Sequence, residues 1–290
     1  MTSVAIIGPG AVGGAIAAWL SRNPTLDISL CARTSFARLE VETPAGTLTA
    51  NPPITTDPAS AGPVDWVLIA TKAYDAEAAG RWIAPLLGAQ TRVAVLQNGV
   101  EHIARFAPYV ETARIVPVVV DLPAERVAPG IIRQRRAGSL IAPRTENGAL
   151  FAALFSGTDF PVALVEDFTT ALWRKLCVNC AGAVFVVTQK PAGIARRDDV
   201  AALMRGLMRE CIAVGAAEGA SIEDAFPDAV IAGYRAGPAQ SLNSMLADRL
   251  AGRPLEVDAR NGVIVRLGAK HGLATPLNGL MVTLLAASAS

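Results

Sequence analysis

The order of hydrophobic and polar positions divides the chain into two parts of different texture. In the first part, short apolar runs alternate with helical or polar stretches, and each run is bounded by turn residues. Runs of this kind are typical of buried strands. Strands that alternate with helices predict a mostly parallel sheet with helices on both faces. The apolar runs are residues 4–7, 27–32, 65–70, 92–96 and 114–120.

Further segments of the first part show strand-like alternation. Residues 39–42 and 47–50 flank a turn that contains Pro and Gly, which predicts a hairpin. The runs at 130–134 and 139–142 lie close together in the sequence, and we predict that they form an antiparallel addition. The remaining predicted elements are a short helix and a closing strand, residues 151–155 and 162–164.

The pattern changes near Glu166, after which helical periodicity replaces the strand signals. Gly219 and Gly272 stand where two predicted helices end, as glycine commonly does. We therefore predict a Rossmann-type α/β domain over residues 1–166 and an all-helical domain over 167–290. Ligands of such sheets bind outside the carboxyl ends of the strands, which predicts a cleft between the two domains. The predicted helices are residues 170–188, 198–218, 221–234, 239–251, 256–271 and 276–287.

Composition and charge exclude several classes of protein. The net charge is +1 and no basic stripe with interleaved aromatic residues occurs, so we expect no nucleic-acid partner. The densest basic run, residues 133–136, is interpreted as a solvated hairpin. No run approaches the roughly 18 uninterrupted apolar residues of a spanning helix, and the first residues lack a basic leader. We therefore expect a cytoplasmic protein without a membrane partner. The apolar helical half could bury a homodimer contact or only its own core.

The cysteines and histidines do not form a metal-binding pattern. Cys177 and Cys180 make a CxxC pair inside a predicted helix, but no second pair accompanies them. His102 and His271 are the only two histidines. We therefore expect no metal, and we interpret the thiols as small core residues of a reduced, intracellular protein.

The first apolar run ends in the sequence Gly8-Pro9-Gly10-Ala11-Val12-Gly13, and a helix-forming run follows at once. A strand, a glycine-rich turn and a helix form the context of the dinucleotide fingerprint. In it, Gly8 allows the tight turn, Gly10 lets the backbone approach a pyrophosphate, and Gly13 lets the helix lie close to the strand. The helix N-terminus offers N–H groups to the phosphates. The whole loop is therefore predicted to bind a dinucleotide.

The residue after the second strand indicates which dinucleotide. NAD-specific sites place an acid about 20 residues past the glycines to hold the ribose 2′-hydroxyl. Arg33 stands at that spacing, followed by Thr34 and Ser35, and no acid is present. A guanidinium and two hydroxyls suit a 2′-phosphate. The sequence therefore predicts NADP(H), although Arg33 could instead be an ordinary solvated residue after a strand.

Hydride chemistry also requires a proton donor near the substrate. Lys72 and Asn98 directly follow two predicted strands, at their carboxyl ends. Lys175 and Asn179 are four residues apart on a predicted helix and share one face. A partly buried lysine can have its pKa lowered toward neutrality and act as the acid. Lys175 could equally be a surface lysine, and Asn98 an ordinary turn residue. Glu256 could be an ordinary helix-start acid.

Together these pieces resemble the ketopantoate reductase (2-dehydropantoate 2-reductase) family over nearly the full length. Their order and intervals agree with the family as well as their residue types. The matching segments are the loop from Gly8 to Gly13, Thr71-Lys72-Ala73, Gln97-Asn98-Gly99-Val100, the segment from Trp173 to Asn179, Ser244-Met245, Asp248, Glu256-Val257-Asp258 and Asn261-Gly262.

The resemblance implies an NADPH-dependent reduction of 2-dehydropantoate to pantoate, a step of pantothenate biosynthesis. It implies that an NADP-binding domain precedes a helical substrate domain, with Lys175 as the general acid and Glu256 beside it. The substrate would then be surrounded by Asn98, Lys175, Asn179, Ser244 and Glu256, and the cofactor by the glycine loop, Arg33, Lys72 and Asn98.

The chain also departs from the family pattern in its expected substrate pocket. Ala183 and Ser241 stand where the family usually has asparagine, and residues 117–123 lack a common glycine-rich pattern. A buried amide that pairs with a substrate hydroxyl contributes about 1–3 kcal/mol of binding. Two alternatives therefore stay open: a reductase of the same fold for another 2-oxo acid, and a non-catalytic NADPH-binding sensor.

Overall fold

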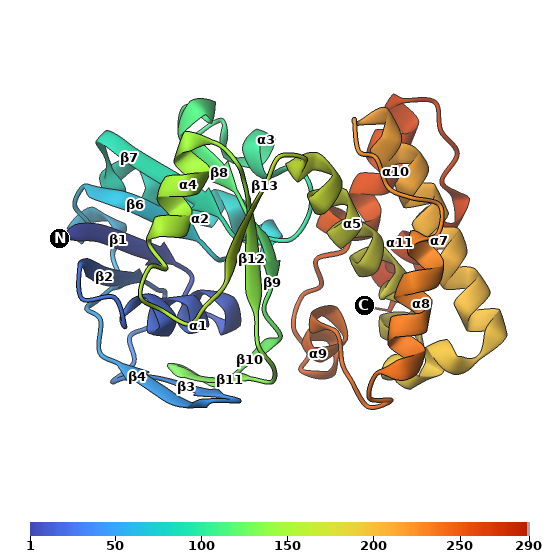
Figure 1. Ribbon diagram of the computed structural model, residues 1–290, viewed down its shortest axis with the longest axis horizontal. Helices are drawn as coiled ribbons and strands as arrows, with labels where there is room; N and C mark the ends of the chain where they lie inside the picture. The colour runs from blue at the N-terminus through green and yellow to red at the C-terminus, as the bar shows by residue number, and fades with distance from the viewer. Residues whose placement is uncertain (289–290) are drawn as a thin grey trace. The chain divides into compact units, whose positions relative to one another are not determined.

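The computed structural model describes residues 1–288 and divides into two compact units. The first unit is Met1–Gln97 with Glu101–Phe168, and the second is Asn98–Val100 with the chain from Thr169 onward. Figure 1 shows the sheets of the first unit in blue to green and the helices of the second in yellow to red. The prediction of a Rossmann-type region followed by an all-helical region is therefore confirmed.

A six-stranded sheet forms the centre of the first unit. Its strand order is β5-β2-β1-β6-β7-β8, and every neighbouring pair is parallel. In sequence terms this is the order 3-2-1-4-5-6 of dinucleotide-binding folds. The strand order reverses between β1 and β6, which is where ligands of such sheets bind. The strands are β1 Thr2–Ile7, β2 Leu26–Cys31, β5 Ile54–Thr55, β6 Val64–Ile69, β7 Leu87–Val95 and β8 Ile115–Pro117.

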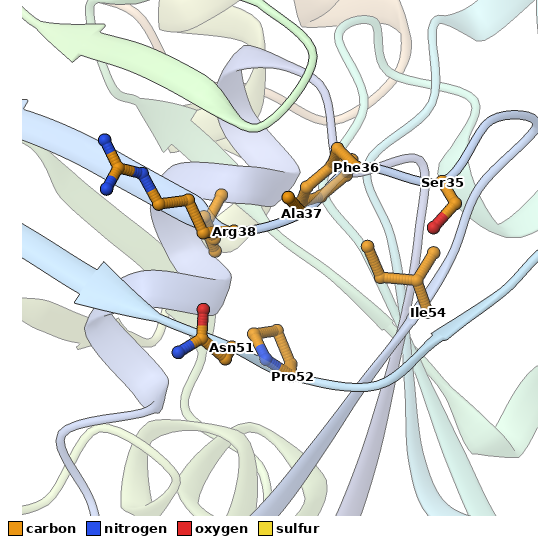
Figure 2. A pocket seen from close by; sticks show the side chains of 8 residues that line it. Ser35, Phe36, Ala37, Arg38, Asn51, Pro52 and Ile54 are labelled. Atoms are coloured by element: carbon orange, nitrogen blue, oxygen red, sulfur yellow. The ribbon is translucent and has the colours of Figure 1, made fainter.

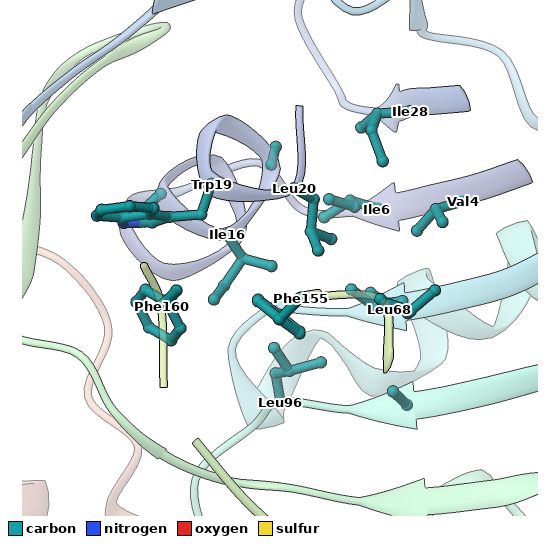
Figure 3. Close-up of a cluster of buried hydrophobic side chains, with 14 of the residues drawn as sticks. Val4, Ile6, Ile16, Trp19, Leu20, Ile28, Leu68, Leu96, Phe155 and Phe160 are labelled. Carbon is teal, nitrogen blue, oxygen red and sulfur yellow. The ribbon is translucent and has the colours of Figure 1, made fainter. Parts of the chain in front are cut away.

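Both faces of this sheet are covered, which explains the uninterrupted apolar runs. Val4 and Ile6 of β1 belong to a core shared with helix α1 (Ala11–Leu20), as Figure 3 shows. Ala5 and Ile7 point to the opposite face and pack in a second core with helix α2 (Ala76–Leu86). The short helix α3 (His102–Phe106) adds to the second core, and α4 (Glu146–Ala153) adds to the first.

The runs at residues 130–134 and 139–142 were predicted to form an antiparallel pair. They lie in two different small sheets, so that prediction is wrong. The four-stranded sheet has the order β10-β11-β3-β4, in which β11 pairs antiparallel with β10 and parallel with β3. The predicted hairpin of β3 and β4 is confirmed. These strands are β3 Leu39–Thr43, β4 Gly46–Ala50, β10 Ala124–Ala128 and β11 Ile131–Gln134.

The run predicted at residues 139–142 forms β12 of a three-stranded sheet of order β13-β12-β9. The segment predicted as one strand over residues 114–120 is divided between β8 of the large sheet and β9 of this one. The pairing of β11 was mispredicted because its antiparallel partner, β10, is mostly exposed and shows no apolar alternation. The strands of this sheet are β9 Val119–Asp121, β12 Ser139–Pro143 and β13 Val162–Val165.

Over the described residues 169–288, the second unit consists of helices and the segments that connect them. Gly219 and Gly272 have positive φ angles of 92° and 67° after α7 and α10, so the predicted glycine stops are confirmed. The elements are α5 Phe168–Ala181, α6 Ala183–Thr188, α7 Asp198–Ala217, α8 Phe226–Ala236, α9 Ser244–Leu250, a π-helical turn Asp258–Gly262, α10 Val263–Lys270 and α11 Pro276–Ala287.

The helix predicted over residues 170–188 is interrupted at Gly182, between α5 and α6. A Cβ atom at this glycine would lie 2.4 Å from Nδ2 of Asn243, which donates to the Gly182 carbonyl oxygen at 2.9 Å. Oδ1 of Asn243 accepts from the Leu246 N–H at 2.7 Å and caps α9. This cap explains why α9 begins at Ser244 and not near residue 239, and it ties the start of α9 to the break between α5 and α6.

The core of the second unit contains the CxxC pair. Cys177, Cys180 and Cys211 are buried free thiols, and burial raises the pKa of Cys211 well above its usual value. The interpretation of Cys177 and Cys180 as core residues is confirmed. By length and composition alone, Phe168–Thr188 could cross a membrane; 56% of its apolar 18-residue stretch is buried inside the structure, as in a core helix.

Candidate active site

The glycine loop lies at the reversal point of the large sheet, between β1 and α1. Gly8 has a φ of +84°, and a Cβ there would lie 2.7 Å from Cγ2 of Thr71, which follows β6. A Cβ at Gly13 would lie 2.3 Å from the carbonyl oxygen of Gly8. These two positions require glycine because the chain itself is close. Gly10 differs, because no atom lies within 4 Å of the place a Cβ would occupy.

The N-terminus of α1 suits an anion. No side chain caps the helix, and its first turn contains no acidic residue. The N–H of Gly10 is held by the carbonyl oxygen of Gly8 at 2.7 Å, which fixes the loop. The first N–H groups of a helix have no partner within the helix and carry partial positive charge. An open side at Gly10 next to such a helix end fits the pyrophosphate of a dinucleotide.

Gln97 holds together the loops that follow β6 and β7. Its Nε2 donates to Oγ1 of Thr71 at 2.9 Å and to the carbonyl oxygen of Lys72 at 3.1 Å. Its Oε1 accepts from Arg105 at 3.1 Å. His102 Nε2 donates to the Gln97 carbonyl oxygen at 2.7 Å, and burial lowers the pKa of His102 to about 4. The neutral imidazole therefore holds the backbone of Gln97 in place. Gln97 in turn fixes the backbone position of Lys72 after β6.

Arg33 follows β2 and is exposed, together with Thr34 and Ser35. Within residues 1–288 its guanidinium makes no hydrogen bond or ion pair, so it is available to an anionic ligand. Ser35, two residues further along the chain, lines a cavity of about 150 Å³ (Figure 2). It is lined by Ser35, Phe36, Ala37, Arg38, Leu39, Asn51, Pro52 and Ile54.

In the second unit, the structure brings three of the predicted residues together. Asn98 belongs to this unit through the segment Asn98–Val100, whose Val100 packs against the helical core. Nδ2 of Asn98 donates to Oε2 of Glu256 at 2.9 Å. Nδ2 of Asn179 donates to Oδ1 of Asn98 at 3.3 Å. Residues that are far apart in the sequence therefore form one hydrogen-bonded chain.

Lys175 and Ser244 adjoin this chain in different ways. Lys175 lies on α5 four residues before Asn179, so the two side chains share one helix face, and Lys175 is half-buried. Ser244 is exposed at the start of α9, and its Oγ accepts from Nη2 of Arg260 at 2.8 Å. The same Nη2 lies 3.7 Å from Oε2 of Glu256. Arg260 therefore links Ser244 to Glu256.

Arg260 was not predicted from the sequence, although a signal existed. It lies four residues after Glu256, the spacing of a helical ion pair. Helical ion pairs of this kind are usually exposed. The signal for burial of Arg260 was the apolar character of its neighbours Ala259 and Val263.

Comparison with known proteins agrees with this geometry. A sequence model described as "Ketopantoate reductase PanE/ApbA" matches residues 4–147, and one for the C-terminal part of that family matches residues 167–289. The chain belongs to the ketopantoate reductase family. A 2-dehydropantoate 2-reductase of Caulobacter vibrioides is 55% identical over 289 residues, covering 100% of each chain.

Other ketopantoate reductases are more distant but still full-length matches. One from Mycobacterium tuberculosis is 42% identical and covers 99% of this chain and 98% of its own. The crystal structure of 2-dehydropantoate 2-reductase from Geobacter metallireducens has a TM-score of 0.93 at 30% identity, covering 99% of each chain. The chain is accordingly an oxidoreductase, and the cofactor of this family is a nicotinamide dinucleotide.

Ala183 and Ser241, the two positions at which the resemblance led us to expect asparagine, add no amide to the polar cluster. Ala183 is fully buried in the helical core. Ser241 is exposed, and its carbonyl oxygen accepts from the N–H of Ala192 at 2.9 Å. The polar cluster joined by hydrogen bonds and one ion pair includes Asn98, Asn179, Ser244, Glu256 and Arg260.

Proposed function

We propose that this chain reduces 2-dehydropantoate (ketopantoate) to pantoate with NADPH. The observation that carries the proposal is the hydrogen-bonded cluster of Asn179, Asn98 and Glu256, with Lys175 one helical turn from Asn179. Relatives named 2-dehydropantoate 2-reductase at 55% and 42% identity support ketopantoate as the substrate. We further propose that the reaction serves pantothenate biosynthesis in the cytoplasm.

The proposed roles follow from the chemistry of each side chain. The cofactor supplies the hydride when it is bound. Lys175 holds the carbonyl oxygen and donates the proton to it. Ionised Glu256 only accepts hydrogen bonds, so it holds a substrate hydroxyl and cannot bind the carboxylate. Asn98 and Asn179 fix the position of Glu256 and keep the substrate beside Lys175. We propose that the residues around the substrate are Asn98, Lys175, Asn179, Ser244 and Glu256.

We propose that the first unit binds NADP(H). The open side of Gly10 and the uncapped N-terminus of α1 support pyrophosphate binding there. Arg33 with Thr34 and Ser35 supports binding of the 2′-phosphate, and the cavity that begins at Ser35 provides room for the adenosine end. The proposed cofactor residues are Gly8, Pro9, Gly10, Ala11, Val12, Gly13, Arg33, Lys72 and Asn98.

Arg33→Ala is expected to weaken NADPH binding by roughly 10–100-fold and to leave NADH binding nearly unchanged. A charge-assisted hydrogen bond contributes about 1.5–3 kcal/mol, and only NADPH carries the 2′-phosphate. Fluorescence titration of both cofactors measures the effect. Arg81→Ala is the control, because Arg81 is an exposed arginine of α2 that pairs only with Glu77. Equal losses for both cofactors at position 33 would contradict the assignment.

The substrate is tested with a panel of 2-oxo acids, in which loss of NADPH absorbance reports turnover. The informative pair is ketopantoate and 2-oxoisovalerate, which lacks the 4-hydroxyl. If Glu256 accepts that hydroxyl, kcat/KM is expected to favour ketopantoate by about 10–100-fold, the contribution of a hydrogen bond to a charged group. A preference for 2-oxoisovalerate would favour the alternative, a reductase of the same fold for another 2-oxo acid.

A homodimer stays a prediction. Leu280 and Leu284 lie one turn apart on α11 and are 50% and 38% exposed, which gives this helix an apolar outer strip. Light scattering of the purified protein would measure the oligomeric state.

A further inference from the structure

Arg260 is buried in a way that its partners do not fully explain. Among the described residues it is the largest fully buried side chain, with an exposure of 1%. It lies within the π-helical turn Asp258–Gly262. A buried guanidinium normally meets a carboxylate through two short hydrogen bonds. Here the carboxylate of Glu256 is 3.7 Å away, and Nε has no hydrogen-bond partner within residues 1–288. The short hydrogen bond that is present joins Nη2 to Oγ of Ser244, at 2.8 Å.

This contact determines the direction of the Ser244 hydroxyl. A guanidinium has no acceptor atom, so Oγ of Ser244 must accept from Arg260. The hydroxyl hydrogen of Ser244 cannot point back to Arg260 and is left to donate elsewhere. Ser244 is exposed at the first turn of α9, which its neighbour Asn243 caps. The O–H group is thus directed away from Arg260 and can donate to a ligand.

The charges of the cluster indicate the kind of ligand. Arg260 places a positive charge directly behind Oγ of Ser244, at 2.8 Å. A carboxylate combines a negative charge with an acceptor oxygen for the Ser244 hydroxyl.

We propose that Arg260 is a positioning residue that orients Ser244 to bind the carboxylate of the 2-oxo acid substrate. The proposal rests on the proposed function of this site. Arg260 does not touch the substrate, because its whole side chain is only 1% exposed. Its proposed effect on the substrate carboxylate is transmitted by the hydrogen bond to Ser244.

A double-mutant cycle tests this coupling. Arg260→Met and Ser244→Ala should each raise KM for the 2-oxo acid by about 10–100-fold, as expected for a hydrogen bond to a charged group. The values of kcat and of KM for NADPH should change less than about threefold. The double variant should be no worse than the poorer single variant, because both changes remove the same donor. Effects that multiply would overturn the proposal.

Arg260→Lys and a matched control keep the test decisive. Lysine also carries donors and no acceptor, so Arg260→Lys should fold and restore part of the contact with Ser244, with a KM at least about threefold below that of Arg260→Met. A KM in folded Arg260→Lys as high as that of Arg260→Met would also overturn the proposal. Arg249→Met is the control: Arg249 is a half-buried arginine of α9 that also has an unpartnered Nε but donates to the Ser288 carbonyl oxygen. It should lower Tm without changing KM.

The cycle is run with whichever 2-oxo acid the wild-type protein reduces fastest. If that acid is not ketopantoate, the proposed substrate is wrong, and the cycle still decides whether Arg260 acts through Ser244. If no 2-oxo acid is reduced, both proposals fail.

Discussion

Lys175→Ala is expected to lower kcat by roughly 10²–10⁴, the usual contribution of general acid catalysis, while NADPH still binds normally. Lys175 is the one ionisable donor that shares a helix face with Asn179, which adjoins Asn98 and Glu256 through hydrogen bonds. Without it, water has to supply the proton to the carbonyl oxygen. Steady-state turnover of ketopantoate and titration with NADPH measure the two quantities separately.

Two variants serve as controls for this prediction. Lys175→Arg should not restore the rate, because a guanidinium does not release a proton near neutral pH. Lys190→Ala should leave kcat unchanged, since Lys190 is an exposed lysine of the same unit outside the cluster. A kcat for Lys175→Ala within a few-fold of the wild type would remove Lys175 from the mechanism.

Gly13→Ala is expected to reduce both stability and cofactor affinity. Its Cβ would lie 2.3 Å from the carbonyl oxygen of Gly8 and 2.9 Å from Cβ of Ala70, so α1 must move away from the sheet. Overpacking of this kind costs about 1–3 kcal/mol. If the displaced loop loses the same free energy in binding, NADPH affinity falls by up to about 100-fold. Thermal unfolding and NADPH titration measure the two effects.

Gly10→Ala is the matched comparison within the same loop. No atom lies within 4 Å of its Cβ position, so the substitution should leave Tm nearly unchanged. The methyl group would nevertheless occupy the open side on which the pyrophosphate is proposed to bind. A selective loss of NADPH affinity is therefore expected. Full affinity in Gly10→Ala would contradict the placement of the cofactor against this loop.

The features that were predictable from the sequence are those set by short-range rules. The loop from Gly8 to Gly13 lies between a strand and a helix because each glycine spacing serves one local geometry. Gly219 and Gly272 end helices for a similarly local reason, a positive φ angle. The place of Asn98 shortly after the end of β7 was also predictable. Its contact with Glu256 spans 158 residues of sequence and could not be derived from either segment.

The features that were missed depend on contacts between distant segments. The pairing of β11 with β3 instead of β12 follows from the burial of Ile132 and Val41 against α1, which sequence proximity does not reveal. The break at Gly182 depends on Asn243, which lies 61 residues further along the chain. Arg260 looks like a solvated helix residue until the fold encloses it.

The central claim is that this chain transfers hydride from NADPH to ketopantoate, and one measurement tests it most directly. Wild-type protein is loaded with NADPH, mixed with saturating ketopantoate, and followed by loss of nicotinamide absorbance, with the product identified by mass spectrometry. The account predicts that absorbance is lost and that one pantoate forms for each NADPH oxidised. Tight NADPH binding with no absorbance change for ketopantoate or any other 2-oxo acid would contradict it and favour a non-catalytic NADPH-binding sensor.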